Sequence, residues 1–212
     1  MLPQQYRAGT IDVEGDASAA SYFAALATLN GGRITLSNLG TRTRQGDYAF
    51  FALCEKLGAT LQRASDSTII EGPQTLNAGF DAPVDMSSMP DVAPTLMMIA
   101  PFLERPTRII GLATLRVKEC DRIAAPTREL RKLGVTVEEG PDYMVIEPLS
   151  ATAKPRREVV EIETYHDHRI AMSFGVLASR LPGIRILDPG CVAKTYPNYW
   201  GDWQRAAAAP RA

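Results

Sequence analysis

KLGAT at residues 56–60 decides the fold, because a near copy, KLGVT, stands at residues 132–136. The offset between the two is 76 residues. Other pairs share this offset: Asp66 with Asp142, and Ile70-Glu71 with Ile146-Glu147. Internal repeats of a fixed period indicate one architecture assembled from like units. The sequence therefore predicts at least two copies of one folding unit.

Three aspartates that precede apolar helical patterns extend the repeat to a third unit. They follow one another at offsets of 75 and 76 residues: Asp16, Asp91 and Asp167. We predict an α/β fold (α+β type) of three units, each with the element order β-α-β-α-β-β. The units cover about residues 6–73, 80–149 and 158–205, within a single domain that spans 6–205.

Apolar periodicity and turn residues place the elements inside each unit. The first unit is predicted as a strand at 10–13, a helix at 17–29, a strand at 33–36, a helix at 47–57, and strands at 59–63 and 68–71. The third unit is predicted as a strand at 161–165, a helix at 168–179, a strand at 184–187, and a second helix that opens at 194–197.

The two ends of the chain carry their own expectations. Residues 1–5 are interpreted as an artificial start or a truncated linker, and residues 206–212 as a flexible tail. The third unit lacks its last two strands, so we expect the chain to be a piece of something larger that supplies them. An open sheet edge favours association, and edge-to-edge pairing of the fragment is expected where those strands are missing.

Composition excludes several function classes. The chain has 212 residues, 45% of them hydrophobic and 22% charged, and a formal net charge of −1. This balance gives no electrostatic footprint for nucleic acid or an anionic membrane. The sequence also lacks an apolar run long enough to span a bilayer. Three cysteines without metal-ligand spacing indicate reduced thiols in a cytoplasmic protein, and the pair His166 and His168 is only a weak indication of a metal site, so no metal is expected.

The densest charge cluster is LRVKECDR at residues 115–122. A helical pattern begins at Ile123 and ends at Gly134, so Asp121 is a plausible N-cap. A helix start with Lys118, Arg122 and free N–H groups favours an anion such as phosphate, and a neighbouring carboxylate suggests proton transfer to it. The alternative is a solvated helix start with local ion pairs.

Alignment of the units favours the first interpretation. Equivalent helix starts of like units are expected to lie on one face of the assembly. That face would gather four cations and two carboxylates: Lys118, Arg122, Arg169, Lys194, Asp91 and Glu119. The first unit adds less, namely Asp16 with Arg42 and Arg44. The set is typical of a site for a polyanionic ligand.

Seven segments in the same order resemble the C-terminal half of the EPSP synthases, a family of enolpyruvyl transferases that act on shikimate 3-phosphate. They are VEGDASAASYF (13–23), QGD (45–47), MPDVAPT (89–95), LRVKECDRI (115–123), ELRKLG (129–134), TYHDHRIAMSF (164–174) and LDPGCVAKTYPNYW (187–200). LRVKECDR and DHRIAMSF are the most specific. The resemblance implies two similar domains, each with three units about a pseudo-threefold axis, and a cleft between them.

The resemblance also implies the reaction. Phosphoenolpyruvate is joined to the 5-hydroxyl of shikimate 3-phosphate, and phosphate is released, with no cofactor and no metal. Carried over by position, Asp91 and Lys118 contact the shikimate hydroxyls, with Asp91 able to act as base. Glu119 is the proton donor to, and acceptor from, the methylene carbon. The residues that hold phosphoenolpyruvate, and that form the glyphosate site of the family, are Arg122, Arg169 and Lys194.

Two other functions compete with this interpretation. One is the sister transferase that acts on a UDP-sugar, and the other is a non-catalytic binding module with the same fold. LRVKECDR argues against the first, and joint retention of the six charged residues argues against the second. Because the remaining ligands come from the absent N-terminal domain, we expect the isolated chain to be inactive.

Overall fold

The computed structural model describes residues 7–149 and 158–208. Within the range predicted for the first unit, the elements follow the predicted order from the first helix onward. Its elements are α1 (Ala17–Asn30), β1 (Arg33–Ser37), the 3-10 turn η1 (Gly46–Ala49), α2 (Phe50–Lys56), β2 (Thr60–Arg63) and β3 (Ser67–Glu71). Gly31 in the left-handed conformation (φ 69°) ends α1, which is the role a glycine at this position favours.

The range predicted for the second unit contains every predicted type of element in the predicted order. It comprises β4 (Val84–Asp85), η2 (Pro90–Val92), α3 (Ala93–Ile99), η3 (Ala100–Phe102), β5 (Thr107–Ile110), η4 (Ala113–Val117), α4 (Ala124–Lys132), β6 (Val137–Glu139) and β7 (Tyr143–Ile146). The third comprises β8 (Val160–Ile162), α5 (His168–Ala178), β9 (Ile184–Ile186), η5 (Pro189–Lys194) and α6 (Tyr199–Ala207).

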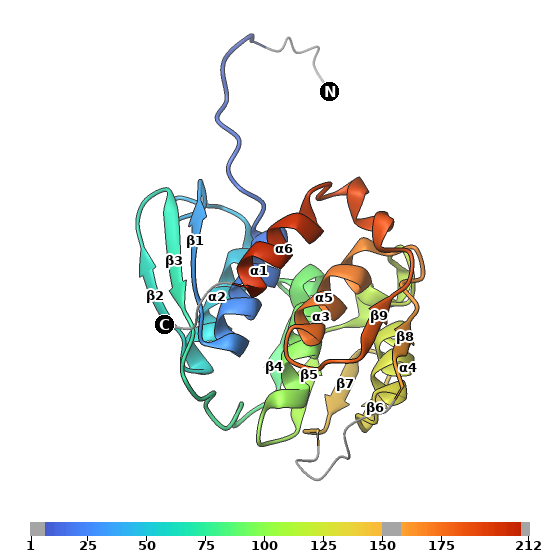
Figure 1. Cartoon of the computed structure of the whole chain (residues 1–212). Helices are drawn as coiled ribbons and strands as arrows, with labels where there is room; N and C mark the ends of the chain where they lie inside the picture. Colours follow the sequence, from blue (N-terminus) through green and yellow to red (C-terminus); the bar gives the residue numbers. More distant parts are fainter. Residues whose placement is uncertain (1–6, 150–157, 209–212) are drawn as a thin grey trace.

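Three small sheets surround three central helices (Figure 1). The strand orders are β1-β3-β2, β4-β5-β7-β6 and β8-β9. β4 runs parallel to β5 and β8 runs parallel to β9, whereas the other pairs are antiparallel. The central helices α1, α3 and α5, one from each predicted unit, contact one another. The pseudo-threefold axis that the resemblance implies stays a prediction.

The central helices are buried because their sequences are apolar around most of their circumference. α1 is rich in alanine, and small side chains let neighbouring helices approach closely. The hydroxyl groups of Ser21 in α1 and Thr95 in α3 are buried and lie 3.0 Å apart, within hydrogen-bond distance. α6 covers this core with Tyr199, whose hydroxyl donates to the carbonyl of Met172 (2.8 Å). The core thereby fixes the relative positions of the helix starts.

The strand predicted at residues 10–13 is wrong. Residues 7–16 form no strand, and Ile11 and Val13 are 83% and 80% exposed. This stretch is tied to the end of β1 at only two points: Gly15 N–H donates to the carbonyl of Asn38 (2.6 Å), and the Asn38 amide donates to the carbonyl of Val13 (2.8 Å). Alternating apolar residues do not form a strand unless the neighbouring edge pairs with them.

The second helices begin later than predicted. η1 precedes α2, so the α-helical part starts at Phe50 rather than Asp47. In the third unit η5 ends at Lys194 and α6 begins at Tyr199, so the run 194–197 precedes the helix instead of opening it. α6 continues to Ala207 and so enters the predicted tail. Residues 1–5, the artificial start or linker of the sequence-based interpretation, and 209–212 lie outside the described residues.

Gly72, which follows β3, lies where the first sheet meets α1. Its N–H donates to the carbonyl of Gly32 (2.8 Å), and a Cβ at residue 72 would overlap the carbonyl oxygen of Ala27. Gly72→Ala should therefore lower the free energy of unfolding by about 1–3 kcal/mol, because the sheet and the helix must separate. Urea denaturation measures this. Gly32→Ala is the matched control, since a Cβ there meets no atom within 4 Å, and equal losses would contradict the packing argument.

Candidate functional site

Two capped helix starts place the charged residues. The carboxylate of Asp167 accepts from the N–H of Arg169 (2.8 Å) at the start of α5. Asp121 Oδ1 accepts from the N–H groups of Ile123 (3.0 Å) and Ala124 (2.9 Å) at the start of α4. The sequence predicts Asp121 as the N-cap, but Ile123 is the residue that directly precedes α4. Asp121 still accepts from the first N–H groups of the helix, and its charge suits the positive end of the helix dipole. Arg122, just before α4, and Arg169, in the first turn of α5, are thereby held at the two helix starts.

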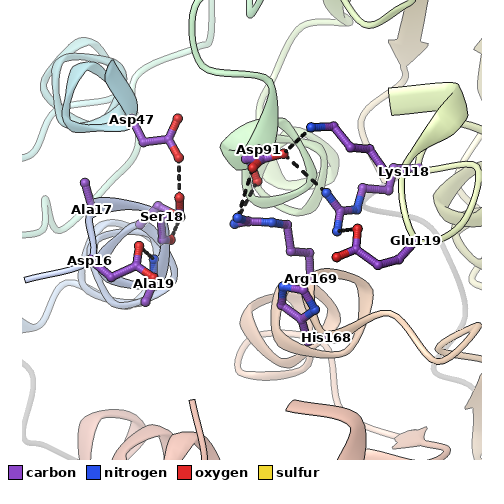
Figure 2. Close-up of polar contacts among 12 residues, drawn as sticks. Asp16, Ala17, Ser18, Ala19, Asp47, Asp91, Lys118, Glu119, His168 and Arg169 are labelled. Carbon is purple, nitrogen blue, oxygen red and sulfur yellow. Dashed lines mark hydrogen bonds and ion pairs between the residues drawn. The ribbon is translucent and has the colours of Figure 1, made fainter. Parts of the chain in front are cut away.

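Asp91, in η2, is the meeting point of three cations (Figure 2). Its Oδ1 atom lies 3.3 Å from Lys118 Nζ and 3.3 Å from Arg122 Nη1. Its Oδ2 atom lies 3.1 Å from Arg169 Nη2, and the other Arg169 terminal nitrogen donates to the Asp91 carbonyl (3.3 Å). This carboxylate therefore joins the segments that precede α3 and α4 to the first turn of α5.

Arg122 is a buried arginine whose guanidinium binds three carboxylates. Its side chain is 1% exposed. Nε donates to Asp167 Oδ2 (2.7 Å), and Nη2 donates to Asp167 Oδ1 (3.2 Å) and to Glu119 Oε2 (2.6 Å), while Nη1 reaches Asp91. The planar guanidinium suits this two-point grip on Asp167, which is itself fully buried. An anion that binds Arg122 must compete with Asp91 or Glu119 for its N–H groups.

Glu119 lies between two cations. Its Oε2 accepts from Arg122, and its Oε1 accepts from Lys194 Nζ (3.1 Å), an ammonium that is 65% exposed. Burial opposes ionisation of this carboxyl, but hydrogen bonds from its own backbone N–H and from Lys194, together with the charges of Arg122 and Lys194, outweigh burial. They hold its pKa at about 2. Glu119 is therefore a carboxylate at neutral pH.

The depressed pKa of Glu119 makes a testable contribution to acid stability. Because its folded pKa is about 2 and its ordinary value 4.5, its contribution is complete above pH 4.5 and is lost as the pH falls toward 2. Glu119→Gln should flatten this part of a plot of unfolding free energy against pH, measured by urea denaturation at each pH. Glu138→Gln is the control, because Glu138 lies on β6 and accepts a hydrogen bond from Tyr143. An unchanged slope in Glu119→Gln would contradict the assignment.

The structure joins all six residues of the predicted face into one network of ion pairs. Asp16 is not part of it and instead caps α1, with its carboxylate accepting from the Ala19 N–H (3.0 Å). Figure 2 shows Asp16, with the bonded pair Ser18 and Asp47, across from Asp91 and Arg169. The Arg42 side chain donates to the carbonyl of Ser65, and the backbone N–H of Arg44 donates to the carboxylate of Glu14.

Sequence reasoning missed two buried groups at this site. Asp167 looks in the sequence like a helix cap, and it is also the main partner of Arg122. Tyr22 of α1 looks like a core residue, yet its hydroxyl lies near Arg169. Burial raises the pKa of Tyr22 to about 12. Burial opposes the charge of Arg169, but Tyr22 and Asp91 outweigh this and raise its pKa. Asp167 has the sequence context of a helix cap and Tyr22 that of a core residue, so no local signal reveals their place at the site.

The arrangement can bind an anion and move a proton. Lys194 and Lys118 are partly exposed, and each is paired with a carboxylate that an incoming anion could replace. Within residues 7–149 and 158–208, no three His, Cys, Asp or Glu side chains are grouped as metal ligands would be. In the same ranges, none of the helices has the length and apolar character needed to cross a bilayer.

Comparison with known proteins places these residues in a family context. The family model described as EPSP synthase (3-phosphoshikimate 1-carboxyvinyltransferase) matches residues 2–203. The chain is 45% identical over 202 residues to the chloroplastic 3-phosphoshikimate 1-carboxyvinyltransferase of Petunia hybrida, and 45% identical over 197 residues to the enzyme of that name from Nostoc punctiforme. In each case the match covers 93% of this chain, and it covers 38% and 44% of the relative, respectively.

Solved structures show the same likeness. The EPSP synthase of Acinetobacter baumannii superposes with a TM-score of 0.75 at 29% identity, over 92% of this chain and 46% of that one. The enolpyruvyl transferase NikO of Streptomyces tendae superposes with a TM-score of 0.67 over 94% of this chain and 44% of that one. At 16% identity the latter likeness concerns the fold alone. The chain thus spans about half the length of the solved proteins it matches.

Proposed function

The chain belongs to the EPSP synthase family, and on that premise we propose that it supplies one half of the active site of an enolpyruvyl transferase. The reaction would join phosphoenolpyruvate to the 5-hydroxyl of shikimate 3-phosphate and release phosphate. The observation that carries the proposal is the single network in which Glu119 is held between Arg122 and Lys194 while Asp91 is held among three cations.

Asp91 and Lys118 are proposed to contact the hydroxyl groups of shikimate 3-phosphate. A carboxylate 3.3 Å from an ammonium can accept the proton of the attacking 5-hydroxyl while the ammonium stabilises the oxygen that loses it. Arg122, Arg169 and Lys194 are proposed to hold the carboxylate and phosphate of phosphoenolpyruvate. Arginine suits the planar carboxylate, and lysine suits the leaving phosphate as a point charge.

Glu119 is proposed to move the proton at the methylene carbon. With both cations beside it the carboxyl has a pKa of about 2 and acts only as an acceptor. An anion bound to Lys194 and Arg122 would draw these charges away from Glu119 and add a negative charge nearby, and both effects raise a carboxyl pKa. Glu119 would then donate its proton to the methylene carbon and become a carboxylate, and this carboxylate would take a proton back from the resulting methyl group as phosphate leaves.

The two halves of the proposal are tested in one assay. Phosphate release from phosphoenolpyruvate and shikimate 3-phosphate would be measured with this chain alone, with a separately produced N-terminal half of a relative, and with their mixture. We expect phosphate release only from the mixture and not from either half by itself. The chain spans only 38–44% of the Petunia and Nostoc relatives, and we expect the other face of the site to come from the remaining part. Turnover by the chain alone at a typical enzymatic rate of about ten per second would overturn the expected inactivity.

Replacing shikimate 3-phosphate by a UDP-sugar in this mixture tests the sister reaction. The family match favours shikimate 3-phosphate, and phosphate release with only the UDP-sugar would reverse the assignment. A mixture that binds phosphoenolpyruvate but turns over neither acceptor would favour the binding-module alternative. The cytoplasmic location stays a prediction, because the curated relatives include a chloroplastic protein and a bacterial one.

A further inference from the structure

Glu129 is a buried carboxylate outside the charged network. We propose that it is a positioning residue that, through Tyr165, holds the start of α5, and with it Arg169, in place against the start of α4. The inference rests on the proposed function, because it assigns Glu129 a role in phosphoenolpyruvate binding. Glu129 lies on α4 and has no exposed surface, so an ordinary solvated helix glutamate is excluded.

The bonds of Glu129 are directed at the segment between β8 and α5. Its Oε1 atom accepts from the Tyr165 hydroxyl (2.7 Å), and its Oε2 atom accepts from the N–H of Glu163 (3.1 Å). Lys132, one turn along α4, supplies the countercharge at 2.5 Å and also donates to the carbonyl of Glu161 (3.3 Å). A buried charge is tolerated when it is paired and hydrogen-bonded in this way.

The segment that Glu129 holds has a conformation that needs support. Tyr165 and His166 both have positive φ angles, 55° and 54°, although neither is glycine. Such backbone persists only where the surroundings over-determine it. The Tyr165 ring is also covered by the Arg128 guanidinium, 5.3 Å from its centroid, and the His166 ring bonds to Asp188 (2.9 Å).

This strained turn leads directly into the site. The N–H of Asp167 donates to the carbonyl of Thr164 (2.9 Å), and Asp167 then caps α5 and grips Arg122. Helix α4 is therefore bonded to the β8–α5 segment at two places, through Arg122 and Asp167 at its start and through Glu129 and Tyr165 further along. Loss of the Tyr165 bond leaves the turn before α5 held to α4 by the Glu163 N–H at this place, and by Asp167 and Arg122 at the other.

Tyr165→Phe tests the inference with the smallest change, since only the hydroxyl is removed. Tyr143→Phe is the matched control: that hydroxyl donates to Glu138 (2.8 Å) and its ring is covered by Arg108 (4.3 Å), but it lies on β7 away from the site. In the mixture of the chain with the complementary half, Tyr165→Phe should raise KM for phosphoenolpyruvate about tenfold, the effect of one lost hydrogen bond to a charged group. Tyr143→Phe should leave it unchanged.

If Tyr165 only stabilised the fold, Tyr165→Phe would lower the fraction of active protein and hence the apparent kcat, and KM for phosphoenolpyruvate would stay unchanged. That outcome would overturn the inference. Glu129→Gln should act in the same direction as Tyr165→Phe, and Tyr165→Phe decides alone if the glutamine variant does not fold. Hydrogen exchange on the chain itself is the second readout. The amide protons of Asp167 and Arg169 should exchange about tenfold faster in Tyr165→Phe than in Tyr143→Phe.

The two readouts separate failure of the inference from failure of the proposed function. If the unmodified mixture shows no turnover, the proposed function fails, and the exchange rates still decide whether Glu129 and Tyr165 position α5. Equal exchange in Tyr165→Phe and Tyr143→Phe overturns the positioning role whatever the activity. Faster exchange together with a raised KM supports both.

Discussion

Arg122→Met should lower the free energy of unfolding of this chain by about 3–5 kcal/mol, the loss typical of removing one partner from a buried ion pair. The reason is Asp167. This carboxylate is fully buried and receives two hydrogen bonds from Arg122, so the methionine leaves a desolvated charge whose main partner is gone. Urea denaturation followed by circular dichroism measures the loss.

Two further variants show whether the loss of stability comes from the buried ion pair or would follow the removal of any paired arginine. Arg63 also binds a carboxylate through two hydrogen bonds, to Glu55 (2.8 and 2.6 Å), but its side chain is 29% exposed. Arg63→Met should therefore cost about 1 kcal/mol or less. The double variant Arg122→Met/Asp167→Asn should recover part of the lost stability, because it removes the orphaned charge. Similar losses for Arg122→Met and Arg63→Met would refute the buried-pair account.

Glu119→Gln should lower phosphate release by the mixture of the two halves by about 10²–10⁴-fold, the range for loss of a general acid–base group. Glutamine preserves the size of the side chain and can still accept a hydrogen bond from Lys194, but it cannot take up or release the proton. The variant should fold and should still bind phosphoenolpyruvate, because Arg169 and Lys194 remain.

Glu138→Gln is the control for charge removal, since Glu138 lies on β6 and bonds to Tyr143 instead of the network. It should retain full activity. If Glu119→Gln kept more than a tenth of the wild-type rate, Glu119 would not be the proton-transfer group and its place between Arg122 and Lys194 would be purely electrostatic. A loss that appears only in the KM for phosphoenolpyruvate would point the same way.

The network has a further consequence for ligand binding. Every cation in it is paired with a carboxylate, so its positive charge is largely neutralised within the site. An incoming anion therefore gains less than four isolated cations would offer, and it must displace carboxylate oxygens from at least some of them. The displaced groups, Asp91 and Glu119, are those proposed to accept protons, so anion binding and acid–base chemistry are coupled in this arrangement.

The repeat at an offset of 76 residues was sufficient to predict most elements, because helix starts and glycine stops are local signals. It failed at residues 10–13, where alternation is present but β1 does not pair with them. It also misplaced the start of α6, because a proline at 197 is compatible with a helix opening without requiring one. Pairing and entry geometry depend on tertiary contacts that the local pattern does not contain.

The same limit applies to the site. The sequence predicted which six residues share a face, because equivalent positions in like units are visible in an alignment of the units. It did not predict that Arg122 is buried, nor that Asp167 and Glu129 carry charge inside the protein. These properties arise from how α4 packs against the β8–α5 segment. The left-handed conformation of Tyr165 likewise has no sequence signal, and that of His166 has only a weak one, since histidine adopts positive φ more often than most residues but still uncommonly.

A carbon-13 titration of the Glu119 carboxyl group in this chain, with and without phosphoenolpyruvate, tests whether Arg122 and Lys194 hold this carboxylate and release it to a bound anion. We expect a pKa of about 2 without the ligand, and a clear rise toward the ordinary value when phosphoenolpyruvate occupies Lys194 and Arg122. A pKa near 4.5 without the ligand would show that the cations do not hold Glu119. A low pKa that phosphoenolpyruvate leaves unchanged would show that this network is not where the anion binds.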